Sequence, residues 1–125
     1  MRITGLDHVQ LAMPRGAEER ARAFYAGLLG LPEVGKPEPL ASRGGCWFEL
    51  GRTIVHLGVE ADFAPARKAH PAFLVSDLEG ARRELAAAGA PVVPDDTLAD
   101  VRRFYTADPF GNRIELIQAG DGFSE

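Results

Sequence analysis

Asp7-His8-Val9-Gln10-Leu11 begins a pattern that the chain repeats about 60 residues later, at His70-Pro71-Ala72-Phe73-Leu74. In each half, a histidine lies near the start of a short apolar run, and a helix-like stretch that ends in Gly and Pro follows. Each half then closes with a Gly-containing turn and an apolar run that carries one polar residue, His56 in the first half and Glu115 in the second. The repetition predicts two related modules whose equivalent side chains can point to one shared centre.

The length and composition restrict the class of protein. The 125 residues fit one domain made of two modules, at residues 3–60 and 68–118, because a module of about 55 residues would be marginally stable alone. A net charge of −4 without a basic stripe argues against a nucleic-acid partner. We expect no membrane span, since no apolar run of about 18 residues occurs, and no secretion signal in Met1–Gln10. The single Cys46 excludes an internal disulfide and a thiolate zinc cluster, and it favours a cytoplasmic location.

Alternation of apolar residues predicts strands, and a spacing of three to four residues predicts helices. In the first half, we expect strands at Leu6–Met13, Glu33–Gly35, Cys46–Leu50 and Thr53–Val59, and a helix at Ala17–Leu29 that Gly30 ends. In the second half, we expect strands at His70–Val75, Val92–Val93, Val101–Tyr105 and Asn112–Gln118. We also expect a helix at Leu78–Ala88 capped by Asp77, a turn at Asp108–Gly111, and an irregular tail at Ala119–Glu125. The polar stretch Glu60–Ala69 links the halves. The order βαβββ, twice, predicts an α+β fold with mostly antiparallel sheets and helices on the outer face.

Four polar residues lie within or at the start of these apolar strands. Alternation places His8, His56, His70 and Glu115 opposite their aliphatic neighbours, on the face of each sheet that the helices leave free. Burying an unpaired carboxylate costs several kcal/mol, and a divalent cation held by imidazoles and one carboxylate would remove that cost. The symmetric placement therefore favours a metal site. The alternatives are solvated strand histidines and an ion pair of Glu115 with Arg113 or Arg103.

The other candidates can be assigned roles at such a site. Tyr105 and Arg103 share one side of a strand and can serve as a general acid and an anion clamp, or as a packing ring and a solvated charge. Trp47 can line a cavity and bind substrate, or belong to the core or a dimer contact. Gln10 follows His8 on the same side of its strand and can support the site. Cys46 is expected to be a small buried residue.

Two motifs resemble the vicinal oxygen chelate superfamily, which includes glyoxalase I, extradiol dioxygenases, fosfomycin-resistance enzymes, methylmalonyl-CoA epimerase and bleomycin-binding proteins. Ala23-Phe24-Tyr25 with Leu28-Leu29-Gly30-Leu31 is similar to the "FY…LG" helix of that superfamily. The run from Asp108 to Leu116, Asp-Pro-Phe-Gly-Asn-Arg-Ile-Glu-Leu, is similar to its "DPDGN.(I/L)EL" segment. The likeness, including Asp7-His8-Val9-Gln10-Leu11 as the opening strand, covers nearly the whole chain.

The resemblance implies paired βαβββ modules that form a cup around a divalent metal ion. Matched by motif, the ligand positions are His8, His56, His70 and Glu115. His8, His70 and Glu115 fit the His/His/Glu set of dioxygenases and fosfomycin enzymes, whereas glyoxalase I has Glu where this chain has His56. His56 can therefore be a ligand, an acid/base or a cavity residue. A homodimer is also implied, and the ligand types suit Fe, Mn, Ni, Co or Zn equally.

Three functions follow as hypotheses. The first is a glyoxalase-like, metal-dependent enzyme that chelates the oxygens of a small organic substrate. The second is a non-catalytic protein that sequesters an antibiotic or metabolite, as bleomycin-resistance proteins do. The third is an Fe(II) extradiol dioxygenase, which the residues present also permit.

Overall fold

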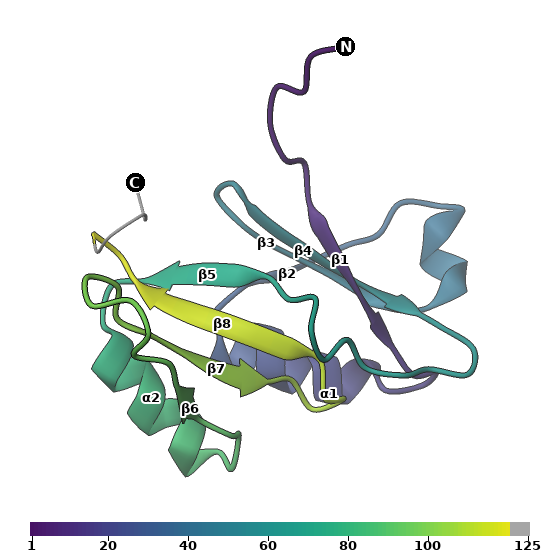
Figure 1. The fold of residues 1–125 in the computed structure, drawn as a ribbon. Helices are drawn as coiled ribbons and strands as arrows, with labels where there is room; N and C mark the ends of the chain where they lie inside the picture. The colour runs from purple at the N-terminus through teal and green to yellow at the C-terminus, as the bar shows by residue number, and fades with distance from the viewer. Residues whose placement is uncertain (121–125) are drawn as a thin grey trace. The chain divides into compact units, whose positions relative to one another are not determined.

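The computed structural model describes residues 1–120 and divides into two compact units, one of residues Met1–Ala64 and one that begins at Pro65. Each unit contains one four-stranded sheet and one principal helical segment, as Figure 1 shows. The α+β class and the βαβββ order in each unit are thus confirmed. The division falls within the linker expected at residues 60–69, and residues 121–125 of the expected tail lie outside the described residues. No helix within residues 1–120 combines the length and hydropathy needed to cross a membrane.

Unit 1 is a mixed sheet with strand order β1-β4-β3-β2. Only β1 and β4 pair in parallel, and the other two pairs are antiparallel. The elements are β1 (Val9–Met13), α1 (Glu18–Arg22), the π-helical turn η1 (Ala23–Leu28), β2 (Glu33–Val34), the 3₁₀ turn η2 (Leu40–Arg43), β3 (Cys46–Leu50) and β4 (Thr53–Val59).

The core of unit 1 forms where the α1–η1 segment covers the sheet. Tyr25 and Phe48 are fully buried, and their rings stack with centroids 5.5 Å apart. The start of α1 is tied to the sheet because the backbone N–H of Gly45 donates to Glu18 Oε2 at 2.8 Å. Cys46 is buried here, as expected. Aromatic packing and polar contacts such as this one therefore fix the helix on the sheet.

The helix expected at Ala17–Leu29 begins at Glu18 and changes its hydrogen-bonding pattern after Arg22. In η1 the N–H of Leu29 donates to the carbonyl of Phe24, five residues earlier, at 2.9 Å. A π-helical turn is wider than an α-helical one and shifts the register of the side chains that follow. Phe24 and Tyr25, which are adjacent in sequence, are both buried in this turn.

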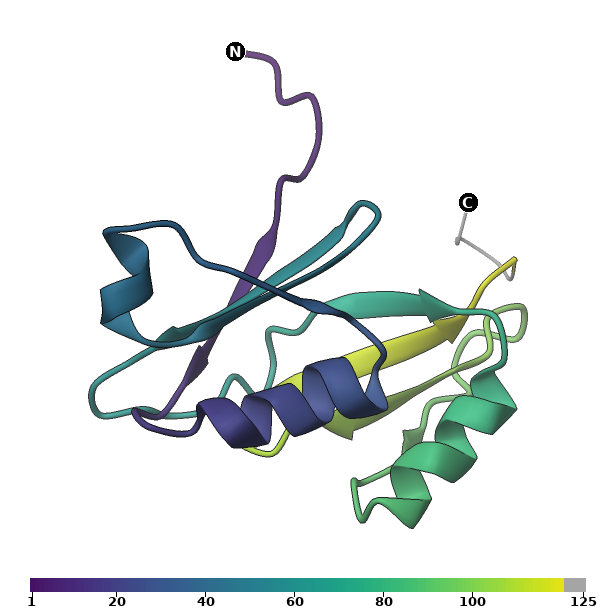
Figure 2. The ribbon, with the colours of Figure 1, turned by 180° about the vertical axis from the view of Figure 1, so that it is seen from behind.

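Unit 2 repeats the topology with strand order β5-β8-β7-β6. Again only one pair is parallel, β5 with β8. The elements are β5 (Ala72–Val75), α2 (Leu78–Ala87), β6 (Val93–Pro94), β7 (Arg103–Ala107) and β8 (Arg113–Gln118). Asp77 caps α2 as expected, since its carboxylate accepts from the N–H of Gly80 at 3.0 Å. α2 contacts β8 and buries Leu85 (Figure 2).

Several strand limits differ from those expected. β1 and β5 begin at the residue where pairing with β4 and β8 starts, so that His8 and His70 lie just before their strands rather than within them. β7 starts and ends two residues later than expected, at Arg103 and Ala107. Its start is delayed because the N–H of Val101 donates to the carbonyl of Leu98 in a turn. The other shifts, at β2, β6, β8 and the end of α2, are of one residue.

The Asp108–Asn112 segment forms a dense hydrogen-bonded turn between β7 and β8. Asp108 Oδ1 accepts from the N–H groups of Phe110 and Asn112, both at 2.9 Å. Asn112 Nδ2 donates to Asp108 Oδ2 at 2.9 Å, and Asn112 Oδ1 accepts from the N–H of Ala66 at 3.0 Å. Gly111 adopts a φ of 94°, which side-chain-bearing residues rarely tolerate. The motif therefore sets the register of the strand that carries Glu115.

Candidate functional site

In unit 1, three rings stack across the three strands β3, β4 and β1. His56 is opposite Trp47 on β3 and opposite Gln10 on β1. The His56 ring stacks on Trp47 with centroids 3.9 Å apart and an interplanar angle of 2°. On its other side, His8 stacks at 4.1 Å and 25°. The two histidines expected at a metal site are therefore neighbours, and Trp47 supports them.

Burial and the nearby His8 lower the pKa of the His56 imidazole and so favour its neutral form. A neutral imidazole keeps one nitrogen lone pair available for a proton or a metal ion. His8 is more exposed, and its Nδ1 lies 2.8 Å from Asp7 Oδ1. A carboxylate at Nδ1 favours the proton there and leaves Nε2 as the acceptor, as is common for metal-binding histidines.

In unit 2, His70 and Glu115 form the equivalent pair. Nε2 of His70 lies 3.0 Å from Oε1 of Glu115, which is nearly buried. Nδ1 of His70 lies 2.8 Å from the carbonyl oxygen of Lys68. A carbonyl can only accept, so Nδ1 carries a proton and Nε2 is the nitrogen that faces the carboxylate. A ring nitrogen and a carboxylate oxygen at this separation share a cation, either a proton or a metal ion.

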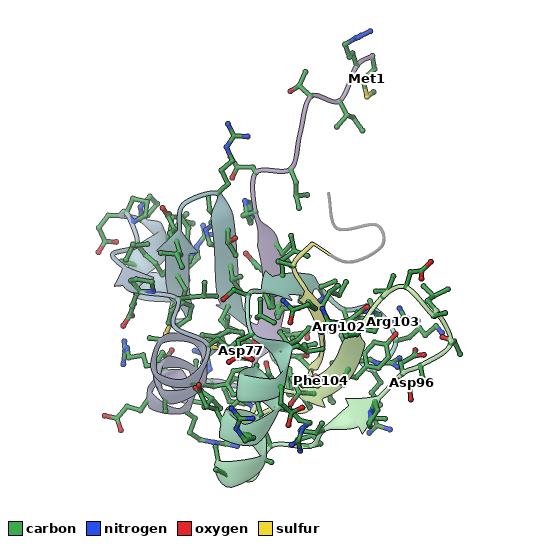
Figure 3. The ribbon with its side chains drawn as sticks, turned by 90° about the vertical axis from the view of Figure 1, so that its left-hand side faces the viewer. Met1, Asp77, Asp96, Arg102, Arg103 and Phe104 are labelled. Atoms are coloured by element: carbon green, nitrogen blue, oxygen red, sulfur yellow. The ribbon has the colours of Figure 1, made fainter. Side chains whose placement is uncertain are left out.

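Arg103 holds the other oxygen of Glu115. Its guanidinium lies 3.1 Å from Glu115 Oε2 and 3.1 Å from Asp95 Oδ2. Figure 3 shows Arg103 on the side of the unit where the loop around Asp96 lies. Burial acts to lower the pKa of the Arg103 guanidinium, but its bonds to Glu115 and the charge of Asp95 leave that pKa raised. Of the two ion pairs considered for Glu115, the structure contains the one with Arg103.

Tyr105 is opposite Glu115 on β7 and connects two groups of side chains. Its ring meets His70 edge-on, with centroids 5.4 Å apart. The guanidinium carbon of Arg113 lies 3.9 Å from the centroid of the same ring, which is within cation–π range. Tyr105 and Arg103 share a strand side as expected, and Arg113 joins them from β8.

The two units place their candidate residues in the same register. In unit 1, His8 comes two residues before Gln10, which pairs with His56. In unit 2, His70 comes two residues before Ala72, which pairs with Glu115. The cross-strand partner of His56 is an aromatic residue, as is that of Glu115. The duplication seen in the sequence therefore extends to individual strand pairs.

The structure does not bring every candidate into contact. The Gln10 side chain lies against Gly58, where its Nε2 would be 2.6 Å from an added Cβ. Within residues 1–120, no group of three or more His, Cys, Asp or Glu side chains is positioned to hold a metal ion. Each unit supplies a pair, His8 with His56 and His70 with Glu115.

Sequence reasoning missed three contributors in unit 2. The roles of Asp95 and the Lys68 carbonyl depend on loop conformation, which carries no local signal. Arg113 was considered only as an ion-pair partner of Glu115. Because it precedes Glu115 by two residues, strand alternation alone places it on the same face.

The two repeated four-stranded sheets of βαβββ order are those of a vicinal oxygen chelate protein. Residues 10–117 match the family described as Glyoxalase-like domain, and the chain belongs to that family. A search of the curated proteins gave no match.

Solved structures agree with this assignment. A protein assigned to the glyoxalase family from Bacillus anthracis is 51% identical, with a TM-score of 0.89, and the match covers 94% of this chain and 97% of that one. The fosfomycin resistance protein FosX from Listeria monocytogenes is 16% identical, with a TM-score of 0.72 and coverage of 94% and 93%. An integron cassette protein from Vibrio cholerae is 23% identical, with a TM-score of 0.69 and coverage of 94% and 97%. The last two support the fold only.

Proposed function

We propose that the protein is a divalent-metal-dependent enzyme of glyoxalase-like type, of the lyase or isomerase class, that acts on a small oxygenated organic molecule. His8, His70 and Glu115 are the proposed ligands, and His56 is a fourth ligand or the acid/base. The proposal also includes a homodimer and a cytoplasmic location. Sedimentation of the purified protein tests the dimer.

The observation that carries the proposal is the contact between His70 Nε2 and Glu115 Oε1 at 3.0 Å. Nδ1 is committed to the Lys68 carbonyl, so the ring meets Glu115 through Nε2, and an imidazole nitrogen beside a carboxylate oxygen is a suitable donor set for a divalent cation. Two ligand atoms at about 2.1 Å from one ion and at right angles to each other are about 3 Å apart. The residues present therefore fit a metal ion.

The surrounding residues would orient and protonate the reacting groups. Arg103 engages Oε2 of Glu115, which leaves Oε1 directed toward His70. His56 is neutral and can accept a proton, and the Tyr105 hydroxyl can donate one. When bound, the metal ion supplies Lewis-acid stabilisation of negative charge that develops on a substrate oxygen.

Metal uptake tests the proposal. Protein purified without a histidine tag is dialysed against Mn²⁺, Ni²⁺, Zn²⁺ or anaerobic Fe²⁺, and bound metal is measured by elemental analysis. We expect about one ion per chain for the wild type and background uptake for Glu115→Gln, His8→Ala and His70→Ala. Glu84→Gln, which makes the same charge change at an exposed site on α2, is the control that retains the metal.

Turnover is the second part of this test. The metal-loaded wild type is screened against hemithioacetals, and against epoxides with thiols or water. Any activity found should disappear with a chelator and return with the metal. A wild type that binds no divalent ion would contradict the proposal.

A sequestering protein is the second candidate, and the Arg103–Glu115–His70 chain favours it. Arg103 compensates the buried carboxylate without a metal ion, so the pair is stable as it stands if His70 is protonated. Trp47 stacks on His56, and its fluorescence can report a ligand that binds to unit 1. Titration with cationic glycopeptide drugs that is unaffected by a chelator would favour this function over the enzyme.

A further inference from the structure

A cavity of about 260 Å³ opens on unit 2 beside Tyr105. Pro91, Val93 and the Tyr105 ring give it an apolar wall, and Arg67 and Arg113 give it a basic one. The combination of apolar walls with a few polar groups is typical of a small-molecule site.

Packing holds Arg113 in a defined position at this wall. Its guanidinium lies 3.9 Å from the centroid of the Tyr105 ring. One of its nitrogens, Nη1, lies 3.5 Å from the carbonyl oxygen of Arg67, so the two arginines adjoin. A guanidinium held against a ring keeps the donors at its edge available, and such preorganised donors suit a planar oxyanion.

The positive charge at this wall has no carboxylate partner within residues 1–120. Within the described part of the chain, neither Arg67 nor Arg113 pairs with a carboxylate, whereas Arg103 contacts both Asp95 and Glu115. Arg82 is likewise paired, with Glu79. Two unpaired guanidinium groups at one cavity, in a chain with a net charge of −4, favour an anionic ligand.

The cavity adjoins the His70–Glu115 pair. Arg113 and Glu115 are two residues apart on the same face of β8, which separates their Cα atoms by about 7 Å. Tyr105 contacts both groups, with Arg113 over its ring and His70 at its edge. A compact molecule can therefore reach both the basic wall and the pair.

The geometry points to an anion subsite, in which Arg67 and Arg113 bind a carboxylate or phosphate group carried by an organic molecule whose apolar part rests on Tyr105. That this group is one end of the substrate rests on the proposed function, whereas binding of the anion itself does not. The substrate class is then a small organic acid or phosphate ester whose other oxygens lie near Glu115.

Binding is tested by NMR titration of the ¹⁵N-labelled protein in the presence of a chelator, so that no metal contributes. The probes are benzoate, its neutral analogue benzamide, and inorganic phosphate. We expect benzoate to shift the side-chain N–H signals of Arg67 and Arg113, and benzamide to bind at least tenfold more weakly. If phosphate competes with benzoate, the site binds oxyanions in general. If phosphate does not compete, the site is selective for carboxylates. Either outcome supports the subsite.

Matched variants complete the test. Arg113→Gln should weaken benzoate binding about tenfold, Arg67→Gln by a similar factor, and Arg113→Lys less than Arg113→Gln. Arg83→Gln, on the exposed face of α2, should change nothing. Equal binding of benzamide and benzoate, or benzoate binding unaffected by Arg113→Gln and Arg67→Gln in folded variants, would overturn the subsite. Failure of metal uptake alone would overturn the proposed enzyme and leave the subsite intact.

Discussion

Replacing Asn112 with alanine should remove its side-chain hydrogen bonds to Asp108 and Ala66 from the interior of unit 2. Asn112 is 1% exposed, donates to the Asp108 carboxylate at 2.9 Å and accepts from the N–H of Ala66 at 3.0 Å. The neutral bond contributes about 1 kcal/mol and the bond to the carboxylate about 2 kcal/mol, so the free energy of unfolding should fall by about 3 kcal/mol. The loss is large because both partners stay in place without a replacement.

Urea denaturation followed by circular dichroism measures this loss. With an m-value of about 2 kcal/mol/M, the midpoint should fall by about 1.5 M. Ser42→Ala, which removes one exposed hydrogen bond to the carbonyl of Pro39, is the control and should cost less than about 0.5 kcal/mol. A loss below about 1 kcal/mol for Asn112→Ala would refute the reasoning.

Asn112→Asp separates the loss of a donor from a change of shape. The substituted side chain keeps an oxygen for the N–H of Ala66 but places a carboxylate against Asp108. We expect a loss of about 2 kcal/mol at neutral pH from the missing bond and the like charges. This loss should shrink in acid, where a proton shared by the two carboxyl groups restores a donor.

Three further predictions concern stability. The N–H of Gly45 lowers the pKa of Glu18, so the carboxylate stabilises the fold above its unfolded-state pKa. Glu18→Gln should therefore lower the free energy of unfolding by about 1 kcal/mol at pH 7. In a series of urea titrations, this difference from wild type should vanish as pH falls through the folded-state pKa. Gly45→Ala should lower the free energy of unfolding by at least about 2 kcal/mol, because an added Cβ would lie 2.2 Å from the carbonyl oxygen of Leu57. The control Gly30→Ala, at a similar φ but in open space, should lower it by only about 1 kcal/mol in the same assay. Thr106→Val should raise the free energy of unfolding by about 1 kcal/mol, since it removes a buried hydroxyl without a partner, and a lower melting temperature in calorimetry would contradict this.

Local patterns in the sequence were sufficient for the elements that have strong alternation and clear turns. The bounds of β3 and β4 agree with those expected, because Gly51 allows the tight turn that fixes their register. The starts of β1 and β5 could not be predicted, since they depend on where a distant parallel partner begins to pair. Parallel pairing is a long-range property that residue alternation does not encode.

For the candidate site too, the sequence predicted some features and not others. Alternation placed Tyr105 and Arg103 on one strand side, and the structure agrees. The partners of each group could not be predicted, because the contact of Arg103 with Asp95 and that of His70 with the Lys68 carbonyl both depend on loops. The stacking of His56 between Trp47 and His8 depends on register across three strands, which the sequence of any one strand does not determine.

Anomalous diffraction from crystals grown with Mn²⁺ or Zn²⁺ tests the central claim most directly. The account predicts one strong peak per chain at about 2.0–2.3 Å from Nε2 of His8, Nε2 of His70 and Oε1 of Glu115. Data without such a peak, or with His70 and Glu115 still joined directly at 3.0 Å while the metal binds elsewhere, would contradict it.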